Sequence, residues 1–129
     1  MIVPPDSRST ALAAARAALE KQAEDVVVMD LRSLSSVTDF FVLCTAGSGR
    51  QIEALKDHLE AALLELGWPV GHTEGSVGSP ARSGPEDRAF HWILMDFGEV
   101  VVHLFDQRAR TFYRLEDLWA DAPRLSLPS

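Results

Sequence analysis

Residues 47–67 carry the signals that begin, continue and end an amphipathic helix. Ser48 is followed three residues later by Gln51, which is the spacing of a capping box. Apolar residues then recur at helical intervals, namely Ile52, Leu55, Leu59, Leu63 and Leu66, and Gly67 follows as a C-cap. The chain is therefore predicted to form one long helix here, with a single apolar side.

Short apolar runs on either side of this helix predict β-strands. VVVMDL and FFVLCTA precede it, and FHWILMDF and EVVVHLF follow it around Gly98, which predicts a hairpin. The other expected elements are a helix from about Ser9 to Ala23, strands Val26–Leu31 and Phe40–Ala46, strands Phe90–Phe97 and Glu99–Phe105, and one or two short helices within Arg108–Trp119.

These elements predict a single α/β domain, in which a mixed β-sheet is flanked by helices. The expected order is helix, strand, strand, helix, strand, strand, helix. The stretch Gly71–Arg88 is rich in Gly, Ser and Pro without an apolar period, so it is expected to be a long loop. Residues 1–8 are expected to be a flexible N-terminus, residues 9–122 the domain and residues 123–129 a tail.

The composition excludes several classes of protein. Nineteen acidic residues against twelve Lys and Arg give a net charge of −7, which disfavours nucleic-acid binding and suits a basic protein surface such as those of the ribosome. Cys44 is the only cysteine, so an internal disulfide and a cysteine-based metal site are excluded. No signal peptide or membrane-length apolar run is visible, and a cytoplasmic protein is expected.

The predicted hairpin divides into two faces, because side chains alternate along a strand. With a two-residue turn at Gly98, one face is uniformly apolar and is expected to face the core: Ile93, Met95, Phe97, Val100, Val102 and Leu104. The other carries Trp92, Leu94, Asp96, Val101, His103 and Phe105. Such a mixture is typical of binding patches, so this second face is a candidate contact surface. The alternative is that helices cover it and that Asp96 and His103 bond to each other.

Candidate catalytic or ligand sites are weak. Asp96, Glu99 and His103 lack a second histidine at ligand spacing, so a structural role is favoured over a metal site. Cys44 lies within an apolar run and is expected to be a buried, inert thiol. Residues 47–49 could bind an anion at a helix N-terminus, but the absence of any Asp-x-Asp or Asp-x-Glu favours a simple helix cap. We expect no catalytic residue, no metal and no cofactor.

Four segments together resemble the Iojap family, the bacterial and organellar ribosomal silencing factors. They are DVVVMDLRSLSSVTDFFVLCTAGSGRQIEAL (Asp25 to Leu55), the pair Glu74 and Gly75, HWILMDFGEVVVHLF (His91 to Phe105) and RTFYRLEDLW (Arg110 to Trp119). The resemblance spans roughly Glu24 to Pro123. It implies a nucleotidyltransferase-like fold without the catalytic carboxylates. It also implies binding to the large ribosomal subunit through its protein numbered fourteen (uL14), which blocks subunit joining and represses translation when nutrients are short.

Carried over by motif, the expected ribosome-contact residues are Glu74, Gly75, Trp92, Leu94, Asp96 and Glu99, with His103 and Tyr113 behind them. Two departures from the family pattern stand out. Ala46 holds the place of a usual glycine, and sixteen residues separate Gly75 from Trp92, so residues 76–89 are expected to be an inserted loop. Other hypotheses are a ribosome-assembly factor and a nucleotide-binding enzyme. A homodimer is compatible with an exposed apolar face when no ribosome is present.

Overall fold

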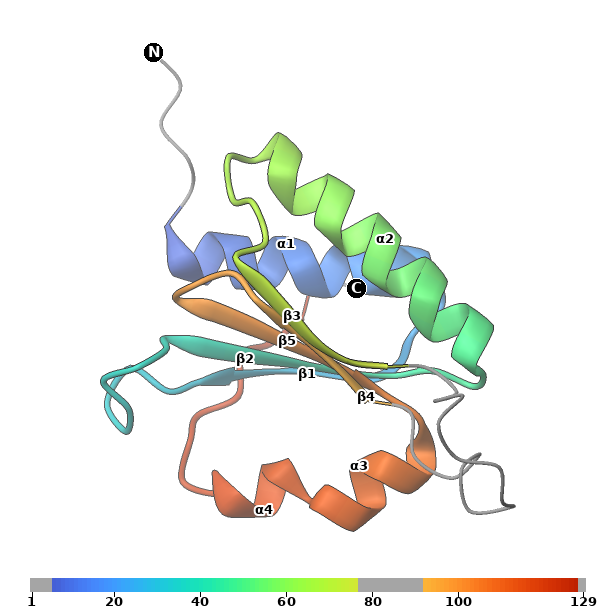
Figure 1. The fold of residues 1–129 in the computed structure, drawn as a ribbon. Helices are drawn as coiled ribbons and strands as arrows, with labels where there is room; N and C mark the ends of the chain where they lie inside the picture. The colour runs from blue at the N-terminus through green and yellow to red at the C-terminus, as the bar shows by residue number, and fades with distance from the viewer. Residues whose placement is uncertain (1–5, 77–91, 128–129) are drawn as a thin grey trace.

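A five-stranded mixed β-sheet separates two layers of helices (Figure 1). The computed structural model describes residues 6–76 and 92–127, without the side chains of Ser76, Phe112 and Tyr113. The elements are α1 (Ser7–Glu20), β1 (Glu24–Asp30), β2 (Phe40–Thr45), α2 (Gly49–Glu65), β3 (His72–Ser76), β4 (Trp92–Asp96), β5 (Val100–Phe105), α3 (Gln107–Tyr113) and α4 (Leu115–Leu118). Helices α1 and α2 lie on one face of the sheet, and α3 and α4 on the other.

The strands are arranged in the order β1-β2-β5-β4-β3. β2 and β5 run parallel, with Phe40 opposite Val100 and Thr45 opposite Phe105. The pairs β1–β2, β5–β4 and β4–β3 are antiparallel. A parallel pair needs a long crossover. Here the chain leaves β2 through α2, adds β3 and β4 at one edge, and returns to the centre as β5.

The predicted α/β class and the mixed sheet flanked by helices are confirmed, but the predicted order is wrong in one place. β3 lies at the start of the stretch that was predicted to be a loop. Its sequence, HTEGS, contains no apolar residue, and its positions from His72 to Gly75 are exposed. An exposed edge strand shows no apolar alternation, because it is held by backbone pairing to its neighbour. Residues 77–91, which include nearly all of the expected inserted loop, lie outside the described residues.

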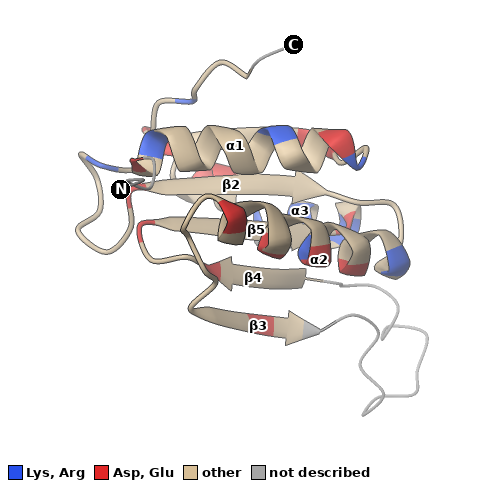
Figure 2. Ribbon diagram, turned by 90° about the horizontal axis from the view of Figure 1, so that it is seen from above, with Lys and Arg blue, Asp and Glu red and all other residues tan. Residues whose placement is uncertain are grey.

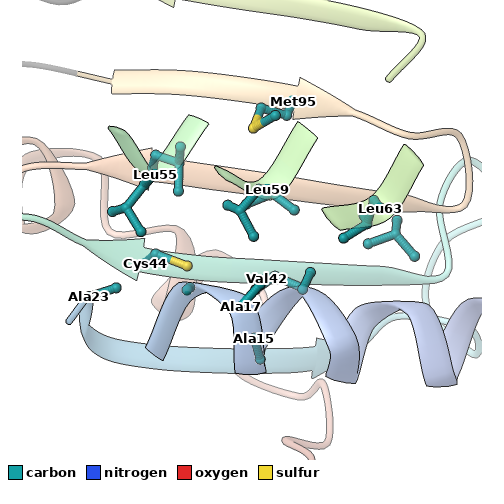
Figure 3. Close-up of a cluster of buried hydrophobic side chains, with 14 of the residues drawn as sticks. Ala15, Ala17, Ala23, Val42, Cys44, Leu55, Leu59, Leu63 and Met95 are labelled. Carbon is teal, nitrogen blue, oxygen red and sulfur yellow. The ribbon is translucent and has the colours of Figure 1, made fainter. Parts of the chain in front are cut away.

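The larger core lies between the sheet and helices α1 and α2. Helix α2 contributes Ile52, Leu55, Leu59 and Leu63, and Figure 3 shows the three leucines directed towards the sheet. The last residue of its predicted apolar side, Leu66, is the C-cap and is 36% exposed. Helix α1 contributes almost only alanines, which allow it to lie close to the sheet and to α2. Cys44 is fully buried in this core, and burial raises the pKa of its thiol to about 12. The prediction that Cys44 is buried is therefore confirmed, and a raised pKa favours an unreactive thiol.

The predicted cap of α2 also joins the two helices. Ser48 Oγ accepts the Gln51 backbone N–H at 3.1 Å, and Gln51 Oε1 accepts the Gly47 backbone N–H at 2.8 Å. The Gln51 amide nitrogen donates to the carbonyls of Lys21 and Gln22 at 3.3 and 3.2 Å. One side chain thus satisfies groups at the N-terminus of α2 and at the chain that leaves α1.

Both ends of the described chain are attached to the fold. Asp6 Oδ1 accepts the Ser9 N–H at 2.8 Å and caps α1, which begins at Ser7. Near the C-terminus, residues 123–125 run along the outer edge of β1. Asp30 donates its N–H to the Pro123 carbonyl, and Leu125 donates to Val28. Within the described residues, no helix is long and apolar enough to cross a membrane.

Replacing Gln51 with Ala is expected to lower the free energy of unfolding by about 1 kcal/mol, because Gly47 loses its acceptor and two carbonyls lose their donor. Urea denaturation measures the change. Glu53→Ala, at an exposed position of the same helix, is the control. Equal losses in the two variants would contradict a specific role for the Gln51 bonds.

Candidate partner-binding site

The hairpin of β4 and β5 has the two-residue turn on which the predicted division into faces depends. Phe97 donates its N–H to the Val100 carbonyl at 2.9 Å, which leaves Gly98 and Glu99 as the turn. The pairs then run from Asp96 opposite Val101 to Trp92 opposite Phe105. The predicted core face is confirmed, because all six of its residues are buried in the core beneath α1 and α2.

The opposite face is covered over one strand and partly open over the other. On β5, the side chains of Val101, His103 and Phe105 are at most 8% exposed. They lie towards a second core that includes Ala109, Leu115 and Trp119 from the α3–α4 region. On β4, Trp92, Leu94 and Asp96 are half-buried. The C-terminal region therefore covers the β5 half of this face, whereas the β4 half is partly open.

A cross-strand row connects the exposed edge of the sheet to this second core. Glu74 lies opposite Leu94 on β4, and Leu94 lies opposite His103 on β5. The side chain of Glu74 is 65% exposed, whereas His103 is 3% exposed. Glu74, Gly75, Trp92 and Leu94 together line a hollow of about 110 Å³. We call these four residues the β3–β4 strip, and all four are among the predicted contact residues.

Gly75 allows β3 to lie against β4. Its φ is +95°, and a Cβ built on it would lie 2.0 Å from the Trp92 carbonyl oxygen. That separation is far below van der Waals contact, so no other residue fits without a backbone shift. Gly75 therefore acts through the backbone, by bringing Glu74 alongside Leu94.

The side chain of Trp92 is hydrogen-bonded to that of His103, which lies on the neighbouring strand β5. The indole Nε1–H donates to His103 Nδ1 at 3.2 Å, and the two rings stack with centroids 5.8 Å apart. Trp92 also stacks on Phe105 at 6.2 Å, while Phe41 meets the edge of the imidazole at 4.7 Å. Burial lowers the pKa of His103 to about 4, so the imidazole is neutral at neutral pH.

Asp96, Glu99 and His103 do not form a common site. Asp96 Oδ1 accepts the Gly98 N–H at 2.7 Å and closes the hairpin turn. Glu99 is exposed at that turn, and its carbonyl accepts the Asp39 and Phe40 N–H groups. The alternative in which Asp96 bonds to His103 is wrong, because His103 Nδ1 accepts from Trp92 and His103 Nε2 has no partner among the described residues. Among the described residues, no three His, Cys, Asp or Glu side chains cluster as metal ligands do.

Two further predicted positions lie elsewhere. Tyr113 ends α3, and its side chain lies outside the described residues. The turn at residues 47–49 is occupied by its own cap bonds with Gln51, which favours the predicted helix cap over an anion site. The sequence reasoning missed His72, whose Nε2 lies 2.9 Å from Glu74 Oε1. Its position two residues before Glu74 is a signal only once β3 is recognised as a strand.

A larger cavity, of about 640 Å³, lies between β1 and the α3–α4 region. Its most buried charge is Arg110, which donates to the Asp25 carbonyl, to Thr45 Oγ1 and to Glu116 Oε1. Arg114 pairs with Asp117 at 2.8 Å, and Arg124 approaches Glu116 at 3.8 Å. The Arg110 bonds to Asp25 and Thr45 attach α3 to the sheet, and the ion pairs join residues 110–124 to one another. Size alone therefore does not make this cavity the functional site.

Replacing Gly75 with Ala is expected to lower the free energy of unfolding by about 3 kcal/mol or more, from the positive φ together with the clash at Trp92. Gly98→Ala is the matched control. Gly98 also has a positive φ, +97°, but a Cβ there meets nothing within 4 Å, so a loss of only about 1–2 kcal/mol is expected. Thermal or urea denaturation compares the two, and equal losses would argue against the close approach.

His103 is expected to make stability depend on pH. Its folded pKa of about 4 lies below the ordinary value of 6.5, so between these values the unfolded chain binds a proton that the folded chain does not. The contribution to the free energy of unfolding is complete above pH 6.5 and falls by about 3 kcal/mol as the pH drops towards 4. Urea titrations of the natural protein and His103→Phe across this range measure the difference. Parallel pH profiles would contradict the assignment.

Comparison with known proteins identifies the family. A family model described as "Ribosomal silencing factor during starvation" matches residues 4–129. The ribosomal silencing factors of Bacillus subtilis and Halalkalibacterium halodurans are 37% and 36% identical to this chain, over 88% and 84% of it and 87% and 83% of their own lengths. The chloroplastic Iojap protein of Zea mays is 34% identical over 93% of this chain and 47% of its own length.

Solved structures of similar proteins share the fold of this chain. A Chromobacterium violaceum protein superposes with a TM-score of 0.75 at 26% identity, covering 97% of this chain and 94% of its own. A Bacillus halodurans protein gives 0.69 at 32% identity, covering 95% and 100%. The bacterial relatives are named for a regulatory role and not for an enzymatic one, in agreement with the prediction that the chain is not an enzyme. By sequence and by fold, this chain belongs to the ribosomal silencing factor family.

Proposed function

We propose that this protein silences translation by binding the large ribosomal subunit at its intersubunit face, through ribosomal protein uL14, so that the small subunit cannot join. The observation that carries the proposal is the β3–β4 strip, the open part of a sheet face whose other part is a buried core. Trp92 and Leu94 are half-buried on β4, which is paired with β3 on one side and with β5 on the other. Apolar side chains on a rigid support are typical centres of protein interfaces.

Charge supports a basic partner. Glu74 lines the hollow, Asp96 lies two residues beyond Leu94 on β4, and Glu99 lies in the hairpin turn, at the end of the hairpin away from Trp92. On the opposite face of the sheet, α2 carries both acidic and basic residues (Figure 2). With a net charge of −7, the protein is suited to a positively charged surface, where such charges mainly govern the rate and orientation of docking.

The proposed mechanism is steric. A domain bound at the intersubunit face occupies space that the small subunit needs, so repression requires no turnover and no cofactor. The affinity for the large subunit and the amount of protein present then set the degree of repression. Its proposed setting is the cytoplasm under nutrient limitation.

Replacing Trp92 with Ala is expected to weaken binding to the large subunit about 30-fold or more, as loss of a central aromatic anchor does. Sedimentation with separated subunits measures binding, and mixing with both subunits measures joining. Circular dichroism must accompany the assay, because Trp92 also packs on His103 and Phe105.

Val37→Ala is the matched control, since Val37 is an apolar residue that is 86% exposed between β1 and β2, away from the strip. It is expected to bind normally.

Failure of the natural protein to sediment with the large subunit, or to reduce joining, would overturn the proposal. Association with immature particles alone would favour an assembly factor instead. Analytical ultracentrifugation of the free protein tests whether a second copy covers the strip when no ribosome is present.

A further inference from the structure

We infer that His103 is a positioning residue for the proposed ribosome contact, and that it holds the Trp92 indole in the orientation in which the ring meets its partner. This inference rests on the proposed function and deepens it. His103 was expected to stand among the contact residues, yet it is 3% exposed, whereas Trp92 is half-buried. It therefore acts through Trp92.

The hydrogen bond between the two residues has a defined direction. Indole Nε1–H is a donor only, so His103 Nδ1, 3.2 Å away, must be the acceptor. In the neutral ring, the proton is then on Nε2. This tautomer leaves Nδ1 permanently available to Trp92.

Ring packing restricts the same side chain in other directions. Trp92 lies at 28° to the His103 ring and at 26° to the Phe105 ring, with ring centroids 5.8 and 6.2 Å away. Phe41 meets the His103 ring edge-on, with an interplanar angle of 74°. These neighbouring rings limit the rotation of the indole, and the hydrogen bond fixes its direction in the ring plane.

A histidine is a costly choice for packing alone at this position. Its Nε2 is buried and has no hydrogen-bond partner among the described residues. A phenylalanine would fill a similar space without a buried N–H group, but it would offer Trp92 no acceptor. The property that distinguishes histidine here is therefore the acceptor at Nδ1.

Holding a side chain in its bound orientation avoids the entropic cost of ordering it on binding, which corresponds to about three- to tenfold in affinity for one side chain. Two variants separate this effect from stability. His103→Phe keeps a ring and removes the acceptor. His103→Asn places its amide near the Nδ1 position, where the carbonyl oxygen can accept, but leaves a gap in the core.

Stability and affinity for the large subunit are expected to rank His103→Phe and His103→Asn in opposite orders. His103→Phe should be at least as stable as the natural protein at neutral pH, yet bind the large subunit about three- to tenfold more weakly. His103→Asn should be less stable, yet bind nearly as the natural protein does. A histidine that only fills space would instead make affinity follow stability.

The indole N–H provides a direct readout without the ribosome. In ¹H–¹⁵N spectra, the Trp92 indole signal, assigned among three tryptophans by Trp92→Phe, should exchange faster with water in His103→Phe than in the natural protein. In the Trp92→Phe background, His103→Phe should cause no further loss of binding, because the coupled group is already gone.

The inference would be overturned if His103→Phe bound as tightly as the natural protein, or if its Trp92 indole signal were unchanged. Failure of the proposed function is distinguishable, because the natural protein itself would then fail to sediment with the large subunit. Binding by the natural protein together with a weakened, stably folded His103→Phe supports the positioning role.

Discussion

The pairing of β5 with β2 on one side and with β4 on the other determines which layer most core side chains enter. β5 is buried along its whole length, and its register with both neighbours places alternate residues above and below the sheet. Ile93, Met95 and Leu104 thus join α1 and α2 in one core, while His103 and Phe105 face the other. A slip of one residue would exchange these faces and place His103 among the leucines of α2.

The two edges of the sheet are treated differently, and this difference creates the candidate site. Residues 123–125 bond to the outer edge of β1, which protects that edge. At the other edge, β3 is exposed, and it can lie close to β4 because Gly75 has no side chain. The α3–α4 region covers β5 but leaves Trp92 and Leu94 half-buried. The open strip is therefore what remains of a face that the short C-terminal helices only partly cover.

Local sequence signals correctly predicted those features that depend on residues close together in the chain. The spacing of Ser48 and Gln51 identified the cap of α2, and the alternation around Gly98 identified the buried face of the hairpin. The same reasoning failed for β3, because its five residues carry no apolar pattern and depend on β4 for every strand contact. The sequence reasoning also grouped His103 with the exposed contact residues. The alternation of side chains along a strand shows which residues share a face, but it does not show what covers that face.

The sequence by itself determined the types of the elements other than β3, most of the core face of α2, the core face of the hairpin, and the family. These depend on periodicity and on motifs within short segments. Tertiary structure decided the place of β3, the burial of His103 and the exposure of Trp92. Each of these depends on which distant segment packs against the strand. The physical reason is that periodicity within a segment shows which of its side chains lie on one face and are buried together. Which distant segment covers that face depends on tertiary contacts, such as those between Phe41, Trp92 and His103, which come from three different strands.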